Sequence, residues 1–196
     1  MNAVAKTYLP LVGWGEGAPG QLLCSVGANN RQGGYLAAQH LIERGCRRVA
    51  FFGDVTLPET RARHDGCADA VAAAGLDQPL QLVPVSLSTG GALDDMRAFL
   101  QSGAARPDAI VAASEVVARS LLVALNDHGL QVPDDIRLVG YDGLPMGDFT
   151  IPQLTTVSQH LQEGSALLVD LLLRRIAGED TQSVVLEPHL VVRQSS

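Results

Sequence analysis

Short runs of consecutive apolar residues alternate along the chain with longer segments in which apolar residues recur every three or four positions. The short runs are typical of strands buried on both faces, and the longer segments are typical of amphipathic helices. The expected strands are residues 9–14, 22–27, 49–53, 80–85, 108–113, 136–141, 155–158, 183–186 and 190–192. The expected helices start near Asn30, Pro58, Ser88, Ser114 and Gln162, and end by Gly45, Ala74, Gly103, Gly129 and Ala177.

This repeated order of strand and helix decides the fold class. Strands that alternate with helices form right-handed βαβ units, in which the strands run parallel and the helices cover the sheet. The sequence therefore predicts an α/β fold, a parallel-sheet three-layer sandwich.

Composition and charge exclude several classes of protein. The chain has 196 residues, of which 46% are hydrophobic and 18% are charged, so it is long enough and apolar enough for a folded core. Fourteen basic residues against 21 acidic ones give a formal charge of −7. Because nonspecific nucleic-acid binding is mostly cationic, the chain is a poor candidate for holding a phosphate backbone by itself. A DNA-binding partner or a further basic domain stays open.

The compartment is expected to be the cytoplasm. The longest apolar stretches, such as residues 166–173, are interrupted by Asp170 and fall well short of the ~20 residues that cross a bilayer. No signal-peptide core stands at the start of the chain. Cys24, Cys46 and Cys67 are odd in number and widely spaced, which favours reduced thiols over a disulfide framework or a zinc site.

Motifs for cofactors and catalysis are weak. Residues 15–20 match the dinucleotide pattern GxGxxG, but a strand is expected directly after them where the motif needs a helix. Thirteen of the 14 basic residues are arginine, with Lys6 as the exception, which excludes a P-loop. There is no GxSxG sequence, and the histidines lack ligand partners at metal spacing. No cofactor, no metal and no catalytic residue is therefore expected.

Polar residues follow several strands at the point where each strand ends. Arg61 and Arg63 come after the strand at 49–53, Glu115 comes after the strand at 108–113, and Asp142 comes directly after the strand at 136–141. Ligands of open parallel sheets bind beyond the carboxyl ends of the strands, so these four side chains are expected to face one crevice. Arginine and carboxylate groups there would bind the hydroxyls or amines of a small polar molecule, at about 1.5–3 kcal/mol for each hydrogen bond. The alternative is that the arginines form surface ion pairs and that Asp142 only begins a turn.

Eight phrases stand in a fixed order along the chain: NNRQGG at 29–34, HLIERGCRRVAF at 40–51, RxRxxG at 61–66, DAIVA at 108–112, GLQVPDDI at 129–136, VGYD at 139–142, PxLTTV at 152–157 and LVVR at 190–193. Together they resemble the effector-binding core of LacI/GalR-family transcriptional regulators. The resemblance runs from about Leu9 to Arg193 and implies two periplasmic-binding-protein-like lobes hinged around a small-molecule effector.

The resemblance also implies roles for individual residues. Arg63 matches the arginine that typically contacts the effector, and Asp142 matches the aspartate that commonly binds ligand hydroxyls or a ring nitrogen. Ser114 stands where the family often has Asn or Ser, and Glu115 stands where Asp is usual.

Two further positions, Glu59 and Leu87, match variable pocket positions of the family. Leu87 replaces an aromatic residue found in some sugar and purine binders, which argues against ring stacking at that point.

The family pattern further implies a domain organisation with an incomplete first lobe. Residues 1–45 would be a remnant of that lobe, 46–153 the second lobe, 154–180 the crossover back to the first, and 181–196 the closing strands of the second. The expected partners are a sugar or sugar-like effector, operator DNA through a helix-turn-helix headpiece absent from this chain, and a second copy in a homodimer. No membrane partner is expected.

Two other functions stay open. A solute-binding protein of a sugar transporter shares the fold, although the wording of residues 132–136 and 154–157 favours the regulators. An α/β enzyme that uses Asp142 or His64 as a base is the second alternative, and it lacks a nucleophile, a metal site and a cofactor loop.

Overall fold

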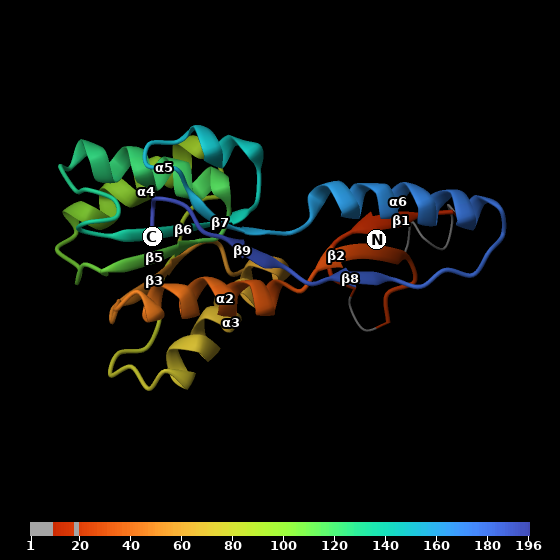
Figure 1. The fold of residues 1–196 in the computed structure, drawn as a ribbon, viewed down its shortest axis with the longest axis horizontal. Coiled ribbons are helices and arrows are strands. Elements are labelled where there is room, and N and C mark those ends of the chain that lie inside the picture. Colours follow the sequence, from red (N-terminus) through yellow and green to blue (C-terminus); the bar gives the residue numbers. More distant parts are fainter. Residues whose placement is uncertain (1–9, 18–19) are drawn as a thin grey trace. The chain divides into compact units, whose positions relative to one another are not determined.

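The structure is a computed structural model, and it describes residues 10–17 and 20–196 (Figure 1). The chain forms two compact units, and each unit is built from two separate segments of the sequence. The larger unit holds Asn30–Ser158 and His189–Ser196, and the smaller unit holds Gln159–Pro188 together with the described residues up to Asn29.

A six-stranded sheet forms the centre of the larger unit, with the strand order β4-β3-β5-β6-β7-β9. Five strands run parallel, as the sequence predicts, and β9 pairs antiparallel with β7 at the edge. The strands are β3 (Val49–Phe52), β4 (Gln81–Val83), β5 (Ala109–Ala112), β6 (Arg137–Asp142), β7 (Thr155–Ser158) and β9 (His189–Val191).

Helices cover both faces of this sheet, which confirms the three-layer arrangement (Figure 1). Helices α2 (Asn30–Glu43) and α3 (Pro58–Ala73) pack on one face, against side chains such as Phe51. Helices α4 (Thr89–Gln101) and α5 (Glu115–Asp127) pack on the other face, against side chains such as Phe52. Successive strand residues point to opposite faces, so the continuous apolar runs supply both halves of the core.

Two helices, α4 and α5, begin at serine residues whose side chains cap them. The hydroxyl of Ser114 accepts a hydrogen bond from the Val117 amide at 3.3 Å, and Ser88 does the same for Gly91 at 3.3 Å. Each cap satisfies an amide that has no partner inside its helix. The Ser114 cap fixes the start of α5 at the carboxyl edge of the sheet.

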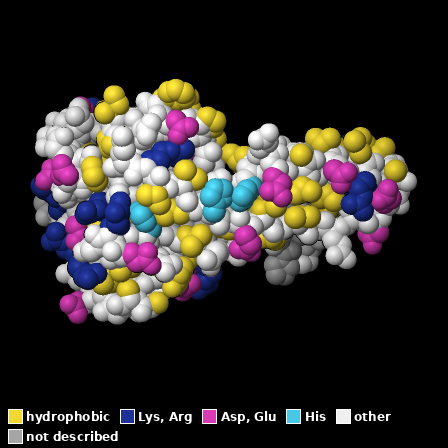
Figure 2. All heavy atoms as spheres, viewed as in Figure 1, with side chains coloured by type: hydrophobic (Ala, Val, Ile, Leu, Met, Phe, Trp, Pro, Cys, Tyr) yellow, Lys and Arg dark blue, Asp and Glu magenta, His cyan; other side chains and the backbone are white. Residues whose placement is uncertain are grey.

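The smaller unit contains a three-stranded parallel sheet in the order β1-β2-β8, covered by helix α6 (Leu161–Ile176). Its strands are β1 (Val12–Trp14), β2 (Cys24–Ala28) and β8 (Val184–Leu186). Strands β1 and β2 and helix α6 share this unit, and Leu9, where the first strand was expected to begin, lies outside the described residues. Figure 2 shows apolar side chains along α6 at the surface, where Val169, Leu173 and Ile176 are exposed.

The unit boundaries differ from the expected domain ranges at three elements. Helix α2 packs against α3 in the larger unit, and β7 pairs with β6 there, so neither belongs with the first strands. Strand β8 pairs with β2 in the smaller unit and does not join the closing strand β9. Pairing partners, which are remote in sequence, decide where these elements belong.

Three other features of the described residues bear on function. The three cysteines are free and buried, which agrees with the expectation of unpaired thiols. No helix in residues 10–17 and 20–196 has the length and apolar character needed to cross a bilayer. The connection between β6 and β7 contains a 3₁₀ helix, η1 (Pro145–Phe149).

Candidate functional site

Arg63 lies at the centre of the polar residues on the carboxyl edge of the larger sheet. It comes from α3 and is only 7% exposed. Its Nε donates to the Asn30 side chain at 2.8 Å, and its Nη1 donates to the Ala113 carbonyl at 2.7 Å. The guanidinium plane also covers the Tyr141 ring, with Cζ 3.9 Å from the ring centroid. These contacts hold the side chain in one orientation, because the planar fork of arginine fits each acceptor in only one way.

Asp142 is the last residue of β6, and its side chain lies beside the Arg63 guanidinium. Its Oδ1 lies 3.7 Å from Nη1 of Arg63, and its Oδ2 accepts a hydrogen bond from the Glu115 amide at 3.3 Å. The side chain is 20% exposed, so part of the carboxylate is open to solvent. The backbone has φ of 115°, a conformation that L side chains rarely adopt and that is often found at functional sites.

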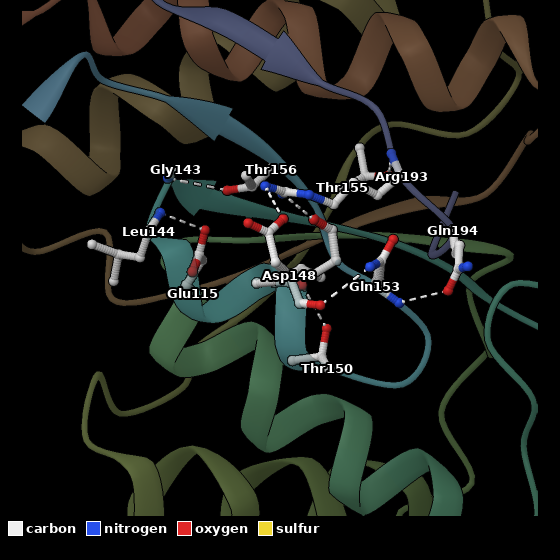
Figure 3. A network of polar contacts seen from close by, with 12 residues as sticks. Glu115, Gly143, Leu144, Asp148, Thr150, Gln153, Thr155, Thr156, Arg193 and Gln194 are labelled. Atoms are coloured by element: carbon white, nitrogen blue, oxygen red, sulfur yellow. Dashed lines mark hydrogen bonds and ion pairs between the residues drawn. The ribbon is translucent and has the colours of Figure 1, made fainter.

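Ser114 and Glu115 begin α5 beside Asp142. Ser114 is partly buried, and its hydroxyl serves as the helix cap. Glu115 is fully buried, and its Oε1 accepts a hydrogen bond from the Leu144 amide at 2.9 Å (Figure 3). The Glu115 carboxylate therefore points under the chain segment that follows Asp142.

The electrostatic environment of Glu115 is mixed. Burial, which disfavours the charged form, raises the pKa of Glu115 above its ordinary value, and the nearby Asp142 carboxylate adds to this. The Thr156 hydroxyl, the Leu144 amide and the Arg193 guanidinium lower the pKa of Glu115 and offset part of the rise.

The other three candidate residues lie less centrally. Glu59 is half exposed, and its carboxylate stands 4.0 Å from Nη2 of Arg63, one helical turn away. Leu87 is partly buried and contacts the apolar clusters on both faces of the sheet. Arg61 is exposed. The structure thus brings Arg63, Asp142 and Glu59 together, and it leaves Arg61 at the surface.

Two residues that hold Arg63 were not among the candidates. Asn30, expected only at the start of a helix, has a buried side chain that accepts a hydrogen bond from Arg63. Tyr141 was part of an apolar strand, and its ring supports the guanidinium. The pattern of the sequence carries no signal for either contact, since the first depends on how α3 packs against α2 and the second on how α3 packs against β6.

The arrangement is suited to binding. Nε and Nη1 of Arg63 are occupied by protein acceptors, while Nη2 has Glu59 only at 4.0 Å. Nη2 can therefore donate to a ligand, and the exposed part of Asp142 can accept from a hydroxyl or an amine. Within the part of the chain that the structure describes, no group of three His, Cys, Asp or Glu side chains could hold a metal ion.

A family model described as "Periplasmic binding protein-like domain" matches residues 38–196. The chain belongs to the periplasmic binding protein-like domain family. Its relatives in that family are transcriptional regulators, and the resemblance to the effector-binding core of LacI/GalR regulators is confirmed.

Three relatives show how far the similarity of this chain to known regulators extends. The ribose operon repressor of Escherichia coli (strain K12) is 35% identical over 172 residues, which are 86% of this chain and 52% of the repressor. The solved complex of the transcriptional regulator CelR with cellobiose has 32% identity and a TM-score of 0.85, over 95% of this chain and 59% of CelR.

The third relative is the solved structure of a LacI family transcriptional regulator from Enterococcus faecium with bound ribose. It has 25% identity and a TM-score of 0.88, over 98% of this chain and 73% of the regulator. The chain spans about half the length of the curated relatives that it matches, such as the 52% of the Escherichia coli repressor.

Proposed function

We propose that this chain is part of the effector-binding region of a LacI-type transcriptional regulator and that it binds a sugar or a sugar derivative. The observation that carries the proposal is the pairing of Arg63 with Asp142, whose charged atoms lie 3.7 Å apart at the carboxyl edge of the sheet. A fixed guanidinium beside a partly exposed carboxylate offers both a donor and an acceptor to vicinal hydroxyls. Relatives solved with cellobiose and with ribose support a sugar as the ligand class.

In this proposal, Arg63, Asp142, Ser114 and Glu59 contribute to one side of the ligand site. Leu87 supplies an apolar wall, and the larger unit corresponds to the second lobe of the family. The smaller unit corresponds to part of the first lobe.

Regulation then follows from unequal binding to two conformations. A ligand that binds one arrangement of the lobes more tightly shifts the population toward it, and this shift alters how a dimer presents its headpieces to operator DNA. Effector binding of this kind involves no chemical reaction, so the proposed protein is not an enzyme. Its proposed location is the cytoplasm, because operator DNA lies there.

A homodimer is part of the proposal. The exposed apolar residues on α6 favour association, because uncovered apolar surface is the usual mark of an interaction site. Light scattering of the 196-residue chain should give at least the mass of a dimer, and a monodisperse monomer would contradict this part.

A thermal-shift screen tests the ligand-binding proposal. Ribose, cellobiose, a purine nucleoside and a small organic acid are added separately to the chain. A ligand at about 100 times its Kd stabilises the folded state by about 2.7 kcal/mol, which raises Tm by roughly 5–10 °C for a protein of this size. We expect a sugar to give such a shift, and Asp142→Asn to abolish it.

Arg61→Ala is the control, because Arg61 is exposed on the same helix as Arg63. It should keep the full shift. Shifts from the acid or the nucleoside alone would refute a sugar site, and equal shifts in Asp142→Asn and wild type would place binding elsewhere.

A further inference from the structure

Glu115 has a fully buried carboxylate, and the residue contacts both Asp142 and the backbone of Leu144. Its relative exposure is 0%. Oε1 accepts from the Leu144 amide at 2.9 Å, whereas Oε2 is buried and makes no hydrogen bond within 3.5 Å among the described residues, although the Thr156 hydroxyl is near enough to lower the pKa of the carboxyl group. A buried carboxylate with only partial hydrogen bonding is energetically costly, so its presence calls for a reason beyond packing.

The chain segment 143–151 lies over Glu115 and is tied to the protein by polar contacts (Figure 3). The Gly143 amide donates to the Thr156 hydroxyl at 3.3 Å. Farther along, the Asp148 carboxylate pairs with the Arg193 guanidinium at 2.7 Å. The outer side of the same segment carries Phe149 and Ile151, which are 80% and 97% exposed. Contacts with Glu115, Thr156 and Arg193 thus hold the segment on the protein, and its large apolar side chains face solvent.

The same residue, Glu115, also contacts Asp142. Its backbone amide donates to Asp142 Oδ2 at 3.3 Å, while its side chain accepts from the amide of Leu144, two residues after Asp142. Asp142 and Gly143 both have positive φ, at 115° and 72°, so the chain turns sharply at this point. Glu115 holds both ends of the turn.

We propose that Glu115 is a positioning residue that couples the Asp142 carboxylate to segment 143–151. A ligand that draws Asp142 Oδ2 away from the Glu115 amide then changes how firmly the segment is held, and with it the exposed Phe149. The ligand part of this inference rests on the proposed function, whereas the coupling between Asp142 and the segment does not.

The charges around Glu115 make the coupling measurable. Asp142 on β6 and Arg193 after β9 are the charged groups that act on it, and Arg193 is shared with Asp148 of η1. Because the negative charge of Asp142 raises the pKa of Glu115, removal of that charge is expected to lower it.

The test follows amide hydrogen exchange of Leu144 by NMR in the 196-residue chain without ligand, from about pH 4 to about pH 8, with rates corrected for intrinsic exchange. In the wild type, protection should weaken as Glu115 is protonated, because a neutral carboxyl accepts less strongly than a carboxylate. Glu115→Gln, which keeps an acceptor of the same shape, should show no such step. Asp142→Asn should move the step to lower pH.

Glu115→Met, which keeps the volume but removes the acceptor, should raise the exchange rate of Leu144 by about tenfold at neutral pH. The control is Glu43→Gln, the same substitution at an exposed carboxylate at the end of α2 outside the proposed site, which should leave both the exchange rate and the pH-dependent step of Leu144 unchanged. The coupling is overturned if the pH-dependent step in Leu144 exchange persists in Glu115→Gln, or if the midpoint pH of that step is unchanged in Asp142→Asn. If Glu115→Met does not fold, these two pH profiles still decide the question.

The absence of any thermal shift with sugars would overturn the proposed function and leave this coupling standing. The two failures are therefore distinguishable, because none of the exchange measurements uses a ligand.

Discussion

Replacement of Arg63 by alanine is the perturbation that the structure describes most completely. The variant removes a buried guanidinium and leaves two acceptors, the Asn30 side chain and the Ala113 carbonyl, without their donor. It also uncovers the Tyr141 ring on which the guanidinium stacks. Arg63→Ala is therefore expected to weaken folding as well as ligand binding.

The magnitude follows from these contacts. Each hydrogen bond from a charged donor contributes about 1.5–3 kcal/mol, and a stacked cation contributes about 0.5–2 kcal/mol. The terms are not additive, and loss of the charge removes a desolvation penalty, so we expect a net loss of about 3–4 kcal/mol. At about 2–4 °C for each kcal/mol, Tm should fall by roughly 10 °C.

Urea unfolding of the 196-residue chain, followed by circular dichroism, measures this loss. Arg61→Ala is the control on the same helix, and as an exposed substitution it should change stability by no more than about 0.5 kcal/mol. If Arg63→Ala were as stable as Arg61→Ala, the contacts of Arg63 with Asn30 and Ala113 would not exist as described.

Three further predictions concern the elements that carry the site. Ser114→Ala removes the cap that accepts from the Val117 amide, and urea unfolding should show a loss of about 1 kcal/mol; an unchanged midpoint would contradict the cap. Gly66→Ala places a methyl group against the Arg31 carbonyl on α2, so calorimetry should show a loss of about 1–3 kcal/mol, and wild-type stability would rule out the close helix contact. Burial lowers the pKa of His40, so the folded state resists protonation and loses stability as the pH falls below about 6.5. In His40→Gln, urea midpoints at about pH 7.5 and about pH 5.5 should lie closer together than in wild type, and an equal spread would refute this reading.

The elements of the fold could be predicted because each carries its own signal. The apolar run at Val49–Phe52 is buried on both faces, and Ser88 and Ser114 cap helices as expected. The direction of β9 and the unit to which β8 belongs could not be predicted. Both depend on partner strands remote in sequence, β7 and β2, and local periodicity contains no information on pairing.

The candidate site was predictable only in outline. The rule that parallel strands end at one edge brings Arg63 and Asp142 together, and the structure has their charged atoms at 3.7 Å. The same rule treats Glu115 as a residue of the crevice, but its side chain turns under segment 143–151 to reach the Leu144 amide. Which way a side chain points at the start of a helix depends on the segment packed over it, and the strand pattern does not specify that segment.

A titration followed by NMR tests the binding site most directly. The ¹⁵N-labelled chain is titrated with the sugar that raises Tm most. We predict that the largest chemical-shift changes occur at the backbone amides of Ser114 and Asp142 and at the Nε–H group of Arg63. A groove of about 390 Å³ lined by Arg47, Arg48 and residues 74–78 is a competing location on the same unit. Shift changes confined to that groove, with Arg63 and Asp142 unmoved at saturation, would contradict the account.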